Sequence, residues 1–312
     1  MTRATHILGV LLVCFGLAFA GAASAQTRPL IFQRLSVEDG LSQSSALALA
    51  LDREGFLWIG TYDGLNRYDG LEVKTYRTDP DAPGSISDVN IRSLLVDSQG
   101  TLWVGTKNGG LNRYDRKTDS FTVFQEDRSR PDALPGNQIR SLFEDSRHRL
   151  WVGGNQGLAL MDREAGTFAG YPGKPGSPGF IGAAEILSLA EDSSGALLVG
   201  ADCGLFRLDP DTGESERLDL GLSSQGRPGP VVLSIMPEDG KIWAGTEANG
   251  LILYDPATRR TETFLPGRAV WTLLKDSGGI FWAGSSRGLA RRLDLQDRSE
   301  EHTSELQSLR HL

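Results

Sequence analysis

The chain has 312 residues, of which 39% are hydrophobic and 23% charged, and its formal net charge is −8. This globular composition excludes intrinsic disorder, a collagen-like fibre and a protein that crosses the membrane many times. The acidic balance argues against a nucleic-acid-binding surface, and the 38 glycines favour many tight turns over long helices.

Residues 1–25 are predicted to be a secretory signal peptide. Arg3 gives a positive start, residues 7–20 are apolar, and residues 23–25 (Ala-Ser-Ala) provide the small side chains of a cleavage site. An uncleaved membrane anchor is the alternative, but the apolar stretch is shorter than the roughly 20 residues that a span needs. We therefore expect an exported protein. After cleavage Cys203 is its one cysteine, so it forms no internal disulfide.

A unit of about 45 residues recurs six times in the middle of the chain. The copy that starts at Ile91 reads IRSLLVDSQGTLWVGTKNGGLNRYD, and the copy before it reads ALALALDREGFLWIGTYDGLNRYD. An anchor position is tryptophan in five copies and leucine in the fourth, and its spacings are 45, 48, 47, 45 and 39 residues. The anchors are Trp58, Trp103, Trp151, Leu198, Trp243 and Trp282.

Each copy divides into short β-rich runs separated by turn residues. In the second copy the runs are residues 91–96, 102–106, 111–114 and 121–125, with Asp and Gly between them. Four short strands with this punctuation form a meander, and a meander repeated every 45 residues or so is typical of a β-propeller blade. We predict an all-β fold: a β-propeller of four-stranded blades over residues 26–297, with six repeats present as part of a seven-bladed propeller.

The repeated residues have structural roles in this interpretation. The anchor tryptophan packs between blades, and an aspartate six residues before most anchors opens the first turn and accepts backbone N–H groups. A glycine two residues after each anchor lets neighbouring chains approach closely. These glycines are Gly60, Gly105, Gly153, Gly200, Gly245 and Gly284. A catalytic ring of aspartates is the disfavoured alternative, because recurrence in nearly every copy indicates architecture.

The two ends of the repeat region differ from its middle. Residues 32–35 resemble the fourth strand of a blade, whereas the sixth copy stops after its third strand, near Leu293. We expect residues 32–35 to complete the sixth blade in this chain and a seventh blade in a longer protein. Residues 298–312, RSEEHTSELQSLRHL, do not continue the repeat. They match the translation of a common sequencing-library adapter in one frame, and we interpret them as an artefact.

The repeats DREGFLWIGTYDGLNRYDG and DSQGTLWVGTKNGGLNRYD resemble the two-component regulator propeller repeat. The resemblance covers residues 31–294, and six copies in register make it specific. It implies a periplasmic sensor region of an inner-membrane receptor. The output domain of such a receptor is a histidine kinase or a diguanylate cyclase. The family has no shared catalytic residues to carry over.

Residues for chemistry are scarce in this sequence. It has no G-x-S-x-G, H-E-x-x-H or P-loop motif, and His148, which lies where other copies have glycine, is the one histidine of residues 26–297. The acidic stretches at residues 79–81 and 209–211 are an alternative calcium site, but they lack the alternating oxygen ligands of a calcium loop. We therefore predict no catalytic residue, no metal and no cofactor.

Binding is the more plausible activity, because variable loops on a rigid scaffold are the usual place for recognition. The turns between the second and third strands should share one face around the central opening. We predict a small polar ligand there, a sugar or a peptide, although ordinary turn residues are the alternative. The candidates are Tyr62, Asp63, Lys107, Asn108, Asn155, Gln156, Asp202, Glu247, Asn249 and Arg287.

Three functions remain open at this point. The first is the sensor region of a signalling receptor, which would be a homodimer without nucleic acid as a partner. The second is a free-standing periplasmic propeller that acts as a scaffold for other proteins. The third is a propeller lyase, which should place histidine and acidic residues on the central face.

Overall fold

The computed structural model describes residues 34–171, 181–182, 184–222 and 229–291. The chain divides into two compact units, residues 1–35 and 36–312, and every element described below lies in the second. The predicted signal peptide, Phe32, Gln33 and residues 298–312 lie outside the described residues. Arg34 and Leu35 are not part of a strand.

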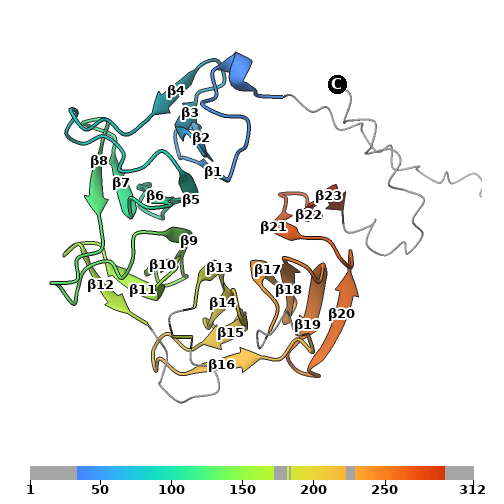
Figure 1. Cartoon of the computed structure of the whole chain (residues 1–312). Helices are drawn as coiled ribbons and strands as arrows, with labels where there is room; N and C mark the ends of the chain where they lie inside the picture. The colour runs from blue at the N-terminus through green and yellow to red at the C-terminus, as the bar shows by residue number, and fades with distance from the viewer. Residues whose placement is uncertain (1–33, 172–180, 183, 223–228, 292–312) are drawn as a thin grey trace, which may run out of the picture. The chain divides into compact units, whose positions relative to one another are not determined.

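The second unit is built from antiparallel sheets that follow one another around a ring (Figure 1). The described residues form five four-stranded sheets and, at the end, one three-stranded sheet. Apart from the 3-10 turn η1 (Val37–Asp39), all described elements are strands. The prediction of an all-β propeller with six four-stranded repeats is confirmed, with three strands described in the sixth.

The sheets are the blades of the propeller, and the second follows its predicted runs to within one residue. The first contains β1 (Ala48–Leu51), β2 (Leu57–Thr61), β3 (Gly64–Tyr68) and β4 (Val73–Tyr76). The second contains β5 (Ile91–Val96), β6 (Leu102–Thr106), β7 (Leu111–Asp115) and β8 (Ser120–Phe124). The third contains β9 (Ile139–Glu144), β10 (Leu150–Gly154), β11 (Gly157–Asp162) and β12 (Thr167–Gly170).

The other three blades repeat this order. The fourth contains β13 (Ile186–Glu191), β14 (Leu197–Ala201), β15 (Gly204–Leu208) and β16 (Ser215–Leu218). The fifth contains β17 (Val232–Glu238), β18 (Lys241–Thr246), β19 (Leu251–Asp255) and β20 (Arg260–Phe264). The sixth contains β21 (Val270–Lys275), β22 (Phe281–Ser285) and β23 (Gly288–Arg291).

The first strand of every blade lies nearest the centre of the ring, and the first strands of consecutive blades contact one another (Figure 1). From β5 onward each of these strands carries one extra residue near its start, because the register with the second strand shifts there. The extra residues are Arg92, Arg140, Leu187, Leu233 and Trp271. Such a bulge redirects a side chain without ending the ladder.

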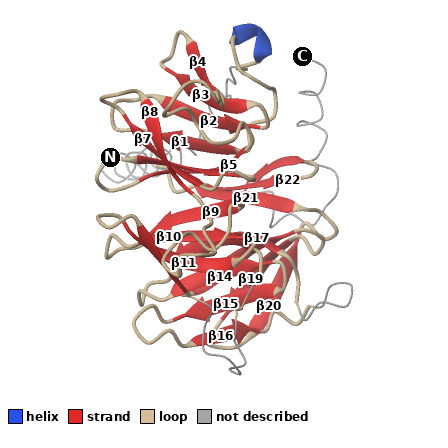
Figure 2. Ribbon diagram, turned by 60° about the vertical axis from the view of Figure 1, so that its left-hand side comes forward, coloured by secondary structure: helices blue, strands red, loops and turns tan. Residues whose placement is uncertain are grey.

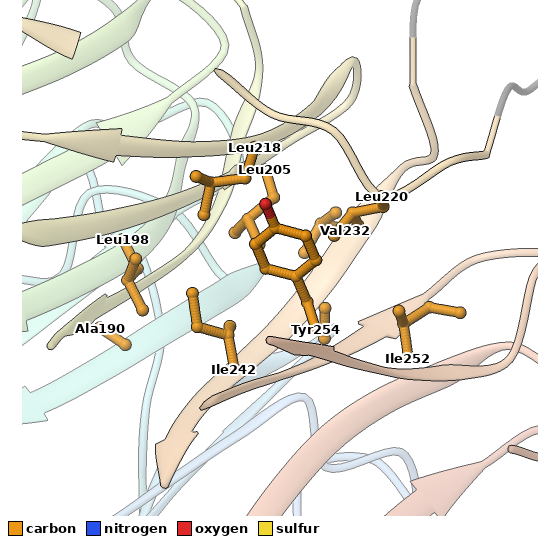
Figure 3. Close-up of a cluster of buried hydrophobic side chains, with 10 residues drawn as sticks. Ala190, Leu198, Leu205, Leu218, Leu220, Val232, Ile242, Ile252 and Tyr254 are labelled. Atoms are coloured by element: carbon orange, nitrogen blue, oxygen red, sulfur yellow. The ribbon is translucent and has the colours of Figure 1, made fainter. Parts of the chain in front are cut away.

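The apolar core lies between neighbouring blades, which Figure 2 shows face to face. In the second blade, Leu94 packs toward Trp58 of the first blade, whereas Leu95 packs into the cluster that contains Leu150 of the third. Figure 3 shows the equivalent layer in which Leu198 of the fourth blade meets Ile242 of the fifth. Both faces of the inner strand β5 are therefore used for packing.

The anchor tryptophan has a polar partner that the sequence analysis did not predict. The indole N–H of Trp103 donates to Asp97 Oδ2 at 2.8 Å, while Asp97 Oδ1 accepts the backbone N–H groups of Gln99 and Thr101. The first, third and sixth blades repeat the pair. The predicted role of the aspartate in the turn is confirmed, and the indole bond extends it. The constant Asp-x5-Trp spacing was the signal for this bond.

Two blades replace parts of this pair. In the fourth blade Leu198 takes the tryptophan position, and Arg207 Nε donates to Asp192 Oδ2 at 2.8 Å. In the fifth blade Pro237 takes the aspartate position, and Glu238, one residue later, accepts the indole N–H of Trp243 at 3.2 Å. Each blade therefore keeps a carboxylate with a bonded donor at this point of the turn.

The repeated glycine after the anchor lies against the next blade. A Cβ atom on Gly105 would stand 2.7 Å from Ile139 Cγ2 and 2.2 Å from Ser93 Oγ. On Gly284, in the sixth blade, the nearest atom would belong to Thr272 of the same blade. The predicted close approach between chains is therefore confirmed wherever a following blade is described.

Candidate ligand-binding site

All ten residues predicted from the sequence lie in turns between the second and third strands of a blade. The backbone N–H of Lys107 donates to the carbonyl of Asn90 at 2.9 Å, and that of Asn155 donates to the carbonyl of Gln138 at 3.2 Å. The fourth, fifth and sixth blades repeat this bond. The turns are thereby held beside the start of the innermost strands, at one end of the ring.

A hydroxyl side chain stiffens most of these turns from within. Thr106 Oγ1 donates to the carbonyl of Gly110 at 2.9 Å and accepts the backbone N–H of Gly109 at 2.9 Å. Thr61, Thr246 and Ser285 occupy the same place in their blades. The side chains that the turns carry therefore project from a fixed backbone, which lowers the entropy lost on binding.

The predicted side chains differ in how far they are already engaged. Asp63 forms an ion pair with Arg77 at 2.9 Å, and Asp202 Oδ1 accepts the backbone N–H of Glu185 at 3.2 Å. Among the described residues, the exposed Lys107 and Glu247 have no polar side-chain partner. Their charged groups therefore remain available to a ligand.

The structure adds residues to this end of the ring that the sequence analysis missed. Arg140 Nε donates to Glu185 Oε1 at 2.8 Å, and Gln138 Nε2 donates to the same oxygen at 3.0 Å. The guanidinium carbon of Arg92 lies 5.3 Å from the ring centroid of Tyr62. The sequence did contain a hint of Arg92 and Arg140. They occupy the second position of the first-strand motif, which is Arg in these two copies and apolar in the others.

A small depression lies near these turns in the third blade. Gln138 and the predicted Gln156 line it, together with Pro135 and several apolar side chains. The predicted Gln156 therefore shares this hollow with Gln138, which directly precedes the inner strand β9.

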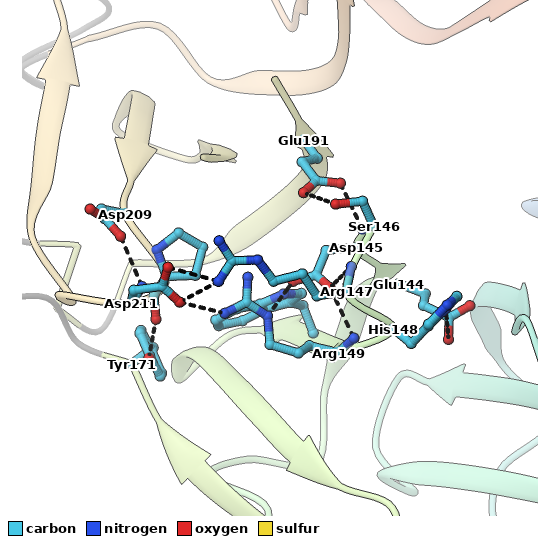
Figure 4. Close-up of polar contacts among 12 residues, drawn as sticks. Glu144, Asp145, Ser146, Arg147, His148, Arg149, Tyr171, Glu191, Asp209 and Asp211 are labelled. Carbon is cyan, nitrogen blue, oxygen red and sulfur yellow. Dashed lines mark hydrogen bonds and ion pairs between the residues drawn. The ribbon is translucent and has the colours of Figure 1, made fainter. Parts of the chain in front are cut away.

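The acidic and basic residues at the opposite end of the blades serve structure (Figure 4). Arg147 bridges to Asp211 at 2.6 Å and holds the pKa of that carboxyl below its ordinary value. Burial favours a raised pKa for Asp145, but hydrogen bonds from Trp151 and Arg149 outweigh it and lower the pKa. Ser146 binds Glu191 of the next blade through its backbone N–H and its hydroxyl.

His148 belongs to this same opposite end. It stands in the first turn of the third blade with φ 62°, where Gly55, Gly100 and Gly195 have positive φ in other blades. Its side chain is exposed and its Nδ1 lies 3.8 Å from Glu144 Oε1. The described residues contain no group of three His, Cys, Asp or Glu side chains suited to hold a metal ion. The acidic residue Asp211 of the calcium alternative is already bound to two arginines.

Comparisons with known proteins agree with the repeat analysis. The family model "Two component regulator propeller" matches residues 40–63, 85–108 and 133–156. A histidine kinase of Formosa agariphila is 41% identical over 80 residues, which make up 26% of this chain and 6% of that protein. In the described residues no helix is long and apolar enough to cross a membrane.

Solved structures share the fold. The extracellular domain of a hybrid two component system from B. thetaiotaomicron is 26% identical with a TM-score of 0.74, and the match covers 84% of this chain and 35% of that one. Virginiamycin B lyase from Staphylococcus aureus is 14% identical with a TM-score of 0.56 over 79% of this chain and 80% of the lyase; this likeness shows the fold alone. Three of the six repeats thus match the two component regulator propeller family, and the histidine kinase and the extracellular domain described above support that assignment.

Proposed function

We propose that residues 26–297 form the ligand-binding sensor region of a signalling receptor, located outside the cytoplasm and not itself catalytic. The chain spans a small part of its histidine kinase relative and about a third of the extracellular domain that it resembles. Signal output therefore belongs to segments other than the described blades. The relatives support a sensor role, and the turn residues supply a place for the ligand.

One observation carries the binding part of the proposal. Turns at one end of the ring are fixed by hydroxyl bonds and by backbone bonds to the innermost strands, yet they expose uncommitted groups such as Lys107 and Glu247. A preorganised rim of charged, amide and aromatic side chains suits a small polar ligand, because recognition costs little ordering. We expect a sugar or a peptide.

A thermal-shift screen tests this proposal directly. The whole chain is heated in the presence of a panel of sugars and short peptides, and we expect the melting temperature to rise with at least one compound, since a ligand that binds only the folded state stabilises it. The triple variant Tyr62→Ala/Lys107→Ala/Asn155→Ala should lose that rise. The control Lys117→Ala/Glu164→Ala removes exposed charges at the other end of the blades and should keep it.

A panel without any stabilising compound would contradict the sensor proposal and favour a scaffold for other proteins. Binding that survives the triple variant would move the site away from these turns. The lyase alternative gains little, because His148, the one histidine of residues 26–297, lies at the other end of the blades from the proposed site.

A further inference from the structure

Arg92 differs from every other residue at its position in the ring. The bulge residue of the innermost strand is apolar in the fourth, fifth and sixth blades, where it is Leu187, Leu233 or Trp271. In the third blade it is Arg140, which has a carboxylate partner in Glu185 at 2.8 Å. Among the described residues Arg92 has no ion-pair or hydrogen-bond partner, and its guanidinium contacts the ring of Tyr62.

The surroundings of Arg92 contain two buried polar atoms without partners. Arg92 Nε, a donor, and Asn90 Oδ1, an acceptor, are both inaccessible to solvent and make no hydrogen bond. Folded proteins rarely leave such atoms unpaired, so each one calls for a physical explanation, and an absent bonding partner such as a ligand is one. A donor and an acceptor two residues apart point to a ligand that offers the complementary pair.

An aromatic face and a second cation complete the group. The ring of Tyr62 lies under the Arg92 guanidinium at 5.3 Å, and Tyr62 is 44% exposed. The backbone of Lys107 is bonded to the carbonyl of Asn90, which places a further uncommitted ammonium on the neighbouring turn. All four residues come from the first two blades and lie at the end of the ring that the proposed function assigns to the ligand.

We propose that Arg92, Asn90 and Tyr62 form a subsite for a carboxylate flanked by a hydrogen-bond donor, an inference that rests on the proposed function. The guanidinium donates to the carboxylate, and planar guanidinium–carboxylate pairs combine charge with fixed geometry. Asn90 Oδ1 accepts the neighbouring O–H or N–H, and the Tyr62 ring contacts the apolar face of the ligand. A sugar acid and a peptide C-terminus both carry this chemistry.

Calorimetric titration of the whole chain with four probes tests the subsite. The acidic probes are glucuronate and N-acetyl-Ala-Ala, and their neutral counterparts are glucose and N-acetyl-Ala-Ala-amide. We expect the affinity for one acidic probe to be at least about tenfold higher than for its neutral counterpart, because a charge-assisted hydrogen bond is lost in the neutral compound. Which acid binds decides between the sugar and the peptide.

Two variants make the test specific. Arg92→Leu introduces the residue that the fourth and fifth blades carry at the same bulge, so the fold should tolerate it, and it should weaken the acidic probe about tenfold or more. Arg140→Leu is the matched control. It removes an equal charge at the same bulge position one blade further on, where the arginine is already paired with Glu185. We expect it to change the affinity less than about twofold.

Equal affinity for acidic and neutral probes, no change in Arg92→Leu, or an equal loss in Arg140→Leu would each overturn the subsite. No binding by either acid would also overturn it. The thermal-shift panel separates these outcomes from failure of the proposed function. If a neutral compound from the panel binds and the triple variant abolishes its effect, while Arg92→Leu does not, the sensor proposal stands and the carboxylate subsite is wrong.

Discussion

The second and the first blade carry nearly the same sequence motif but bury it to different extents. Leu94 and Val96 of the second blade pack against the cluster around Trp58, whereas their counterparts Leu49 and Leu51 on β1 are 61% and 66% exposed. At the other end of the repeats, Leu274 on β21 is 59% exposed, although its counterpart Leu95 packs into the next blade. Burial in this fold therefore depends on the neighbouring blade, since one sheet alone cannot cover its own apolar faces.

The largest expected effect is the loss of stability when an anchor tryptophan is removed, and it should depend on whether blades pack on both sides of that tryptophan. Trp103→Ala removes a side chain that is 1% exposed between two blades, and we expect it to lower the free energy of unfolding by about 3–5 kcal/mol. Trp282→Ala, in the sixth blade, should cost roughly half as much, since no packed blade follows it in the described residues. Urea unfolding followed by far-ultraviolet circular dichroism measures both, and equal losses would contradict a neighbour-dependent core.

A glycine pair tests the close approach between blades. Gly105→Ala would place its Cβ 2.7 Å from Ile139 Cγ2, so we expect overpacking to cost about 1–3 kcal/mol of unfolding free energy. Gly170→Ala is the matched control, because it also lies in a strand but has nothing within 4 Å of the new Cβ. It should change stability by less than about 0.5 kcal/mol. A similar cost for both variants would show that strand propensity, not blade contact, sets the effect.

Acid should weaken the junction between the first two blades. Burial favours a raised pKa for Asp119, but bonds from Lys74, Tyr114 and Tyr76 outweigh it and lower the pKa to about 2. The stabilisation is therefore present above pH 4 and is lost as the pH falls toward 2. Because Asp119 is 40% exposed, we expect less than about 1 kcal/mol.

The Asp119→Asn variant isolates this contribution. The difference in unfolding free energy between the natural chain and the variant should shrink as the pH falls from 5 to 2. Asparagine tolerates the positive φ of 52° at this position. A difference that stays constant over that range would exclude a role for the ionised carboxylate.

The smallest expected effect concerns the turn of the third blade. His148→Gly restores the residue that other blades have at this positive φ, and relief of the backbone cost should raise the free energy of unfolding by about 0.5 kcal/mol. Urea unfolding measures the change, and the variant also loses the 3.8 Å contact between His148 Nδ1 and Glu144 Oε1. A destabilised variant would mean that this contact outweighs the backbone strain.

The repeat made most of the fold predictable from the sequence. The anchor position and the glycine two residues after it located the second strand of all six blades, and the aspartates located the first turn of five blades, because each is set by local spacing. Side-chain partners across strands were not predictable in the same way. The bond from Arg207 to Asp192 within the fourth blade, which accompanies the loss of tryptophan at Leu198, depends on which side chains the register brings together.

The candidate site was predicted in part. Spacing alone placed the ten turn residues, since turns in equivalent positions of a repeat must share an end of the ring. Arg92 was missed, because a lone arginine in an apolar strand motif looks like a tolerated substitution. Its significance depends on burial and on the unpaired atoms beside it, which only the packed structure reveals.

The bulge in the innermost strand has an evolutionary consequence. Because the extra residue does not take part in the ladder register, Arg, Leu and Trp all occupy it without changing the blade around them. Selection can therefore alter the chemistry at the mouth of the ring one residue at a time while the scaffold stays constant. A propeller of this kind could acquire a new specificity through a single substitution, without first losing its ability to fold.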